Sequence, residues 1–175
     1  MSIDLIEAAI RDVPDFPSEG IVFKDISPVL QDAELFRKTV DLLADRCPEA
    51  DMIVGIDARG FLFGGALAYK LGCGMSMVRK KGKLPWQTDG VEYDLEYGSN
   101  AIEIHMDAVK PGDRVVIVDD LLATGGTAAA TVDLVKRIGG DVRAFVCLIE
   151  LQFLNGREAL TGTDVRALIQ VAGGD

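Results

Sequence analysis

The residues best suited to chemistry lie in one short segment, Val115-Val-Ile-Val-Asp-Asp-Leu-Leu-Ala-Thr-Gly-Gly-Thr127. Its β-branched start is typical of a buried strand, and two carboxylates, Asp119 and Asp120, follow directly. A loop of small and hydroxyl-bearing residues then leads into an expected helix: Ala123, Thr124, Gly125, Gly126 and Thr127. Glycines let a backbone approach a ligand closely, and a helix start presents unpaired N–H groups. The loop therefore predicts a seat for a terminal phosphate.

The two acids narrow the choice of phosphate compound. Carboxylates beside a phosphate repel it unless they face hydroxyl groups or a metal ion. A ribose 5-phosphate resolves this conflict, with its phosphate in the glycine loop and its 2′ and 3′ hydroxyls on Asp119 and Asp120. An ordinary strand–turn–helix would explain the glycines but not the consecutive acids. Other nucleotide motifs fail, because no GxGxxG opens a helix and Gly82-Lys83 lacks the first glycine of a P-loop.

A basic cluster forms a second group of interest: Arg79, Lys80, Lys81 and Lys83. It follows an expected strand at 75–78, in a chain whose 18 Lys+Arg and 28 Asp+Glu give a net charge of −10. Clustered cations at a strand exit, beside a long loop, favour a functional role, and the alternative is a solvated charge run. The acidic balance argues against nucleic acid or an anionic membrane as partner.

These residues need a scaffold, and the hydrophobic pattern predicts one α/β domain over residues 1–175. Expected strands are 52–56, 75–78, 91–97, 101–106, 115–118, 142–149 and 165–171. Expected helices are 3–10, 33–46 with Asp32 as its cap, 61–71 and 127–138. This alternation indicates a mostly parallel twisted sheet flanked by helices. Ligands of such sheets bind beyond the carboxyl ends of the strands, so we expect the site at the exits after Ile56, Val78 and Val118.

Composition sets further limits on the class of protein. The three cysteines lie far apart, and with the lone His105 they offer neither a zinc site nor a disulfide framework. His105 and Glu103 alternate on an expected strand, which places both on its solvent face. We expect no signal peptide and no membrane span, because no apolar run approaches ~18 residues. A cytoplasmic protein is the expectation.

The phosphate-binding segment resembles the signature of the type I phosphoribosyltransferases. The resemblance covers nearly the whole chain, and it is most specific for the adenine branch of that family. It rests on PDFPSEGIVFKDISPVL (14–30), ARGFLFG (58–64), RKKGKLP (79–85) and YDLEYG (93–98). It implies the type I fold, with a small N-terminal hood of about residues 1–30 for the base and a mobile catalytic loop. The implied reaction joins adenine to 5-phosphoribosyl 1-diphosphate (PRPP) and yields AMP and pyrophosphate in purine salvage.

The resemblance also implies roles for residues and partners. Glu96 is the expected general acid/base near purine N7, and the peptide between Asp57 and Ala58 is expected to be cis. The residues expected to bind pyrophosphate are Asp57, Ala58, Arg59, Arg79, Lys80 and Lys83. The residues expected to bind adenine are Val22, Phe23, Lys24 and Leu151, with Phe23 and Leu151 on the two faces of the base. Mg²⁺ is expected, held mainly by substrate and water with no direct protein ligand, in a homodimer.

Two alternatives stay open. The first is the same transfer to another purine, such as hypoxanthine or xanthine, and the segment around Phe23 argues against it. The second is a nucleotide-sensing module without catalysis, since regulators have borrowed this fold. Such regulators usually carry an added DNA-binding segment, whereas this sequence shows no basic helix-turn-helix and keeps Glu96 and the basic cluster.

Overall fold

The computed structural model describes residues 3–95 and 98–173. The chain divides into two compact units, Met1–Leu42 and Leu43–Asp175. The single domain with a hood of about 30 residues stays a prediction. Among the described residues, no helix is both long and apolar enough to cross a membrane.

The N-terminal unit is a small hairpin with three helices. Its elements are α1 (Ile3–Ala9), β1 (Arg11–Val13), β2 (Phe23–Asp25), α2 (Ser27–Gln31) and most of α3 (Ala33–Ala44). The antiparallel pair β1–β2 carries ion pairs between Arg11 and Asp25 and between Lys24 and Asp12. Asp32 caps α3 as expected, because its Oδ1 accepts hydrogen bonds from the second and third N–H groups beyond it. The sequence pattern had not indicated β1 or α2.

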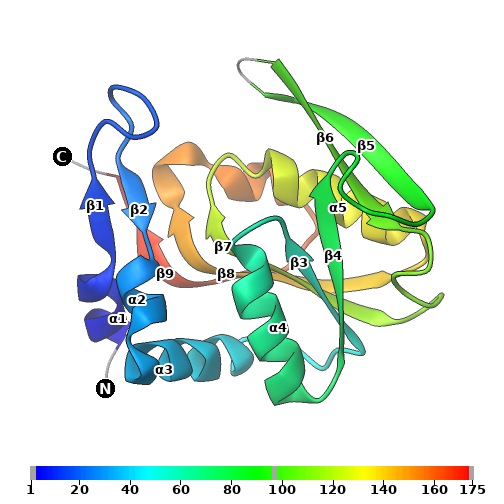
Figure 1. Ribbon diagram of the computed structural model, residues 1–175, viewed down its shortest axis with the longest axis horizontal. Helices are drawn as coiled ribbons and strands as arrows, with labels where there is room; N and C mark the ends of the chain where they lie inside the picture. Colours follow the sequence, from blue (N-terminus) through cyan, green and yellow to red (C-terminus); the bar gives the residue numbers. More distant parts are fainter. Residues whose placement is uncertain (1–2, 96–97, 174–175) are drawn as a thin grey trace. The chain divides into compact units, whose positions relative to one another are not determined.

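The described part of the second unit is built on a sheet of strand order β5-β6-β4-β3-β7-β8-β9 (Figure 1). Its strands are β3 (Met52–Ile56), β4 (Gly74–Lys80), β5 (Thr88–Leu95), β6 (Gly98–His105), β7 (Arg114–Leu122), β8 (Asp141–Leu151) and β9 (Val165–Val171). Strands β4, β3, β7, β8 and β9 are parallel, and the antiparallel hairpin β5–β6 extends the sheet beyond β4. The α/β class and the mostly parallel sheet are confirmed.

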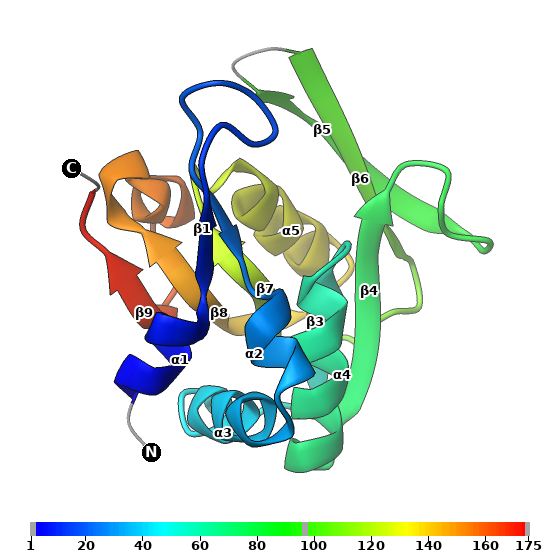
Figure 2. The same ribbon diagram turned by 60° about the vertical axis from the view of Figure 1, so that its left-hand side comes forward.

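Two helices cover opposite faces of this sheet (Figure 2). Helix α4 (Gly60–Leu71) lies over the face that Ile53 and Gly55 share, and Gly72 ends it at φ +70° as expected. Helix α5 (Gly126–Arg137) packs on the other face, in a core with Val54 and Ile56. The short 3₁₀ helices η1 (Gln152–Leu154) and η2 (Gly156–Leu160) follow β8. Successive side chains of a strand point to opposite faces of the sheet, so alternate residues of β3 pack against different helices.

Three sequence expectations were wrong in detail. Strand β7 does not end at Val118 but continues through both acids to Leu122, because β8 is long enough to pair with it at Leu121 and Leu122. Residues 98–100, which lie between the expected strands 91–97 and 101–106, belong to β6 and pair with β5. Glu103 is only 7% exposed, so it does not lie on a solvent face.

Candidate active site

Three parallel strand exits meet at one edge of the sheet, as the sequence predicts. Asp57 follows β3, and its backbone N–H donates to the carbonyl of Val78 on β4 at 2.9 Å. Arg79 Nε in turn donates to Asp57 Oδ2 at 3.1 Å. The peptide bond between Asp57 and Ala58 is cis, which confirms that prediction. The first two exits are therefore joined by both a backbone and a side-chain contact.

The phosphate loop, residues 123–127, borders an open cavity of about 100 Å³ at the start of α5. All five predicted loop residues line it, together with Asp119 and the neighbouring residues Leu121, Leu122 and Ala128. Gly125 has φ +86°, a left-handed conformation that favours glycine, and α5 begins at the next residue. The N–H groups of the first helical turn therefore face this side of the loop, which suits an anion.

A close backbone contact fixes the shape of this loop. A Cβ added to Gly125 would lie 2.3 Å from the carbonyl oxygen of Gly156, and one added to Gly156 would lie 2.3 Å from that of Ala123. The segment after β8 is held there by Arg157, whose guanidinium donates to both oxygens of the buried Glu150 at 2.6 and 2.7 Å. Gly156 and Arg157 were missed by sequence reasoning, because no local pattern shows that the carbonyl of Ala123 approaches Gly156 or that Arg157 pairs with Glu150.

Asp120 is buried and Asp119 half-buried, and each carboxylate has a polar neighbour. Asp120 is 4% exposed, and its Oδ2 lies 3.0 Å from Nε of Arg59 in an ion pair. The backbone N–H of Asp120 donates to Asp119 Oδ1 at 2.8 Å. Burial raises the pKa of Asp119 well above its usual range, and the neighbouring charge of Asp120 raises it further. A Cβ on Gly60 would come within 3.0 Å of Asp119 Oδ1, so a glycine is needed where α4 begins.

A second cavity of about 100 Å³ is lined by two predicted pyrophosphate residues, Asp57 and Lys80, and by Thr127 of the phosphate loop. Its wall combines the ends of β3 and β4, the β5–β6 hairpin and the first turn of α5: Ile56, Asp57, Val78, Lys80, Tyr93, Asn100, Ile102 and Thr127. Lys80 and Thr127 come from the two predicted anion-binding groups. A ligand with phosphates at both ends of a ribose has matching groups on both sides of this space.

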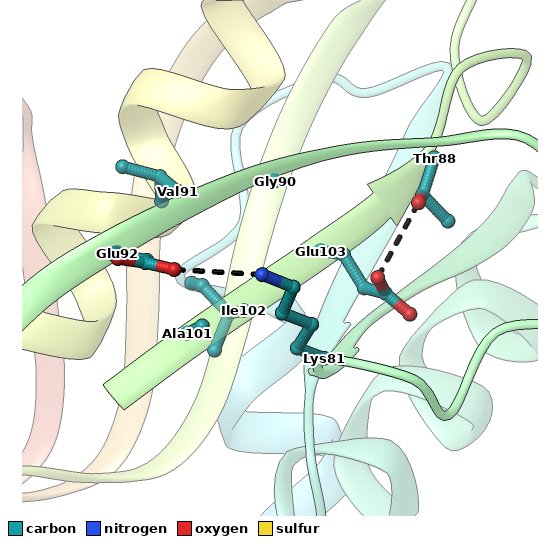
Figure 3. A pocket seen from close by; sticks show the side chains of 8 residues that line it. All are labelled: Lys81, Thr88, Gly90, Val91, Glu92, Ala101, Ile102 and Glu103. Carbon is teal, nitrogen blue, oxygen red and sulfur yellow. Dashed lines mark hydrogen bonds and ion pairs between the residues drawn. The ribbon is translucent and has the colours of Figure 1, made fainter. Parts of the chain in front are cut away.

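The basic cluster divides between two faces. Lys80 lines the second cavity, whereas Lys81 lies 3.4 Å from Glu92 beside an outer hollow of about 390 Å³ (Figure 3). Glu103 holds the loop that follows these two lysines, since its Oε1 accepts from the N–H groups of Gly82 and Leu84 at 3.0 and 3.2 Å. Its other oxygen accepts from Thr88 Oγ1 (Figure 3). Lys83 is exposed, and its carbonyl accepts from Arg79 Nη1.

The remaining predicted residues belong to other elements of the chain. Phe23 is half-buried in the N-terminal unit, where its ring meets that of Phe16 edge-on at 5.2 Å. Val22 and Lys24 flank it in the chain, and Leu151 is the buried last residue of β8 in the other unit. Glu96 lies outside the described residues. Their roles stay predictions.

Comparisons with known proteins agree with the geometry of the site. A family model described as a phosphoribosyl transferase domain matches residues 30–160. An adenine phosphoribosyltransferase of Carboxydothermus hydrogenoformans is 58% identical over 163 residues, covering 92% of this chain and 96% of the relative. The chain belongs to the adenine phosphoribosyltransferase family.

Solved structures of adenine phosphoribosyltransferases agree with this fold. The crystal structure from Thermoanaerobacter pseudethanolicus matches with a TM-score of 0.95 at 52% identity, covering 97% of this chain and 100% of that one. The Saccharomyces cerevisiae enzyme, solved in complex with an imino-altritol bisphosphate and adenine, matches with a TM-score of 0.90 at 40% identity. That match covers 95% of this chain and 97% of the yeast chain. The type I phosphoribosyltransferase fold is thereby shown over nearly the full length.

The contact between the two glycines predicts a large effect of one methyl group. Gly156→Ala is expected to lower the free energy of unfolding by about 1–3 kcal/mol, because the backbone carbonyl of Ala123 has no room to move away. The displaced phosphate loop should also raise the KM for PRPP. Thermal unfolding and steady-state kinetics measure the two effects. Gly65→Ala is the matched control, since its Cβ would meet only Met75 Sδ at 3.7 Å. Equal behaviour of the two variants would contradict the prediction.

The buried acid pair predicts a pH-dependent cost to stability. Because the pKa of Asp119 is higher in the folded protein than the ~3.9 of an unfolded aspartate, its ionisation favours unfolding as pH rises through the folded value. Asp119→Asn should therefore raise the Tm at pH 8 by about 2–4 °C, the shift that ~1 kcal/mol produces in a chain of this size. The gain should shrink toward pH 4. Calorimetry across this range tests it, with the exposed Asp133→Asn as control; a lower Tm of Asp119→Asn at pH 8 would contradict it.

Proposed function

We propose that this protein transfers the phosphoribosyl group of PRPP to N9 of adenine and releases pyrophosphate, forming AMP for purine salvage. The observation that carries the proposal is the joining of the acid pair, the phosphate loop and the cations of β4 around connected strand exits. The names of the full-length relatives supply the base, because all of those reported above act as adenine phosphoribosyltransferases. Transfer to another purine or a non-catalytic sensor finds no comparable support.

The geometry suggests how the substrate would be held. The ribose 5-phosphate group occupies the loop of residues 123–127, where its charge meets helix N–H groups and two threonine hydroxyls. The ribose hydroxyls then face Asp119 and Asp120. Arg59 leaves Asp120 for the more highly charged pyrophosphate, and Asp120 gains a sugar hydroxyl in exchange. Each buried charge thus keeps a partner through binding.

The bond changes place most new charge on the leaving group. The bond from C1 to the pyrophosphate oxygen breaks, the bond from C1 to N9 forms, and adenine loses one proton. Arg79 and Lys80 are proposed to hold the pyrophosphate oxygens, with Arg59, Lys83 and the backbone of Asp57–Ala58 beside them. Cations fixed before the reaction stabilise developing charge more than mobile water does. Water must also be kept from C1, because it would hydrolyse the activated sugar.

Mg²⁺ is proposed as the cofactor, carried by the substrate. The described residues contain no cluster of three or more metal-ligating side chains, and Mg²⁺ often binds through substrate phosphates, waters and one or two carboxylates. Asp119 and Asp120 are the oxygen donors nearest the proposed ribose, so they fit contact through hydroxyls and water. When bound, the ion would neutralise charge on the departing pyrophosphate.

A base panel tests the proposed reaction. AMP formation is measured by chromatography with PRPP, Mg²⁺ and adenine, beside hypoxanthine, guanine and xanthine, and with EDTA as the metal-free control. The expected result is turnover of adenine alone, abolished by EDTA. Turnover of another base would keep the phosphate site and overturn the adenine assignment to Val22, Phe23, Lys24 and Leu151. PRPP binding without any turnover would favour the sensor.

Glu96 is proposed as the general acid/base, on the strength of its place in the YDLEYG motif. Glu96→Gln keeps the size and a hydrogen-bonding oxygen but cannot take a proton. General acid–base catalysis contributes about 10²–10⁴-fold, so kcat should fall by about that factor. The KM for PRPP should change little, because the glycine loop is untouched. Steady-state kinetics with Glu92→Gln as control measures both; an unchanged kcat would sink the assignment.

The assembly and compartment are proposed on two further observations. Trp86 and Met106 are 67% and 57% exposed beside the basic cluster, and Met106 N–H donates to the carbonyl of Gln87, so the two lie close together. Exposed apolar groups of this size suit a subunit contact, which supports the homodimer that the resemblance implies. All three cysteines are free thiols, which fits the reducing cytoplasm.

A further inference from the structure

We propose that Tyr93 is a positioning residue that orients the hydroxyl of Thr127 toward the substrate's 5-phosphate. Tyr93 is on β5 and Thr127 is in the first turn of α5, 34 positions away, yet their hydroxyl oxygens lie 2.7 Å apart. The inference rests on the proposed function, because it takes the phosphate loop as the seat of the 5-phosphate. The proposal adds Tyr93, from the β5–β6 hairpin, to the residues that prepare the phosphate loop for the 5-phosphate.

The contact is part of a docked surface and not a chance meeting of two side chains. Asp89, Val91 and Tyr93 alternate along β5 and so point to one face, the face that meets α5. At the far end of α5, Arg137 pairs with Asp89 and its Nη2 also donates to the carbonyl of Gly90 at 3.3 Å. Asp89 and Tyr93 are about 13 Å apart along a strand, and Thr127 and Arg137 about 15 Å apart along a helix. Two contacts at matched spacing therefore fix how β5 lies along α5.

The ring of Tyr93 lies over the start of the helix. A Cβ added to Gly126 would be 3.6 Å from Tyr93 Cδ2, an ordinary van der Waals contact. Tyr93 and Thr127 also share the wall of the cavity that Asp57 and Lys80 line. The hydroxyl pair is thus at the point where the phosphate loop opens toward the pyrophosphate residues, and it is half-buried from solvent.

The direction of the hydrogen bond decides what Thr127 offers to a phosphate. A threonine hydroxyl has one hydrogen and two lone pairs. If Thr127 donated to Tyr93, only its lone pairs would face the phosphate, and they would repel it. If Tyr93 donates, the hydrogen of Thr127 is left for a phosphate oxygen. A phenol is the better donor of the two because it is the more acidic, so the pair favours the orientation that binds an anion.

The test is a double-mutant cycle with Tyr93→Phe and Thr127→Val. Tyr93→Phe keeps the ring on Gly126 and removes only the hydroxyl, so the protein should fold, with a Tm near that of the wild type. The KM for PRPP and the Kd for ribose 5-phosphate, measured by calorimetry, should each rise about fivefold, the effect of one hydrogen bond. The KM for adenine should not change. In the Thr127→Val background, Tyr93→Phe should have no further effect, since the oriented hydroxyl is already gone.

Controls separate the possible failures. Tyr69→Phe removes a hydroxyl from an exposed tyrosine on α4 and should leave all constants unchanged. A rise of less than about twofold in Tyr93→Phe, or effects of the two substitutions that multiply, would overturn the positioning role. If the wild type bound no ribose 5-phosphate, the seat and this inference would fail together. If it bound ribose 5-phosphate but made no AMP, the proposed reaction alone would fail, and the binding cycle would still decide the role of Tyr93.

Discussion

Two adjacent carboxylates at the buried end of β7 are the constraint that the rest of the site must satisfy. Charge leaves water at a high free-energy cost unless it finds a partner. Arg59 supplies that partner for Asp120, and Gly60 makes room beside Asp119 where α4 begins. The start of α4, the exit of β3 and the end of β7 are therefore adjusted to one another. The proposed contact with sugar hydroxyls gives a reason for keeping these acids even at a cost to stability.

Three polar contacts join described residues of the site. Asp120 forms an ion pair with Arg59, and Asp57 forms one with Arg79. Thr127 shares a hydrogen bond with Tyr93. In the proposed complex, Arg59 and Asp120 exchange each other for the pyrophosphate and a sugar hydroxyl, whereas Tyr93 keeps its hydrogen bond to Thr127. Binding at Arg59 and Asp120 then exchanges one polar contact for others. A group that already has a partner contributes less to affinity than an unpaired group would. Its position, however, is fixed before the substrate binds.

Much of this was predictable from local patterns. The loop of residues 123–127 and the strands at 52–56 and 165–171 depend on short-range signals, namely β-branched runs and small residues before a helix. The adenine branch came from motifs, not from physical reasoning. The length of β7 was not predictable, because it depends on where β8 ends. Glu103 reads as a solvent-face residue until the loop after β4 folds back on it, and the need for Gly156 follows from a carbonyl 33 positions earlier.

The order of the sheet also links activity to the route of folding. Strands β3 and β7 are neighbours in the sheet, although Met52 pairs with Val115 across more than sixty residues of chain. Such non-local pairing forms slowly, because the intervening loop must close first. Asp57 and Asp119 are brought to the same edge only when it has formed. Catalytic competence therefore arises late, with the closing of the parallel sheet, and a nascent chain that stops before β7 holds Arg59 without Asp120 and none of the phosphate loop.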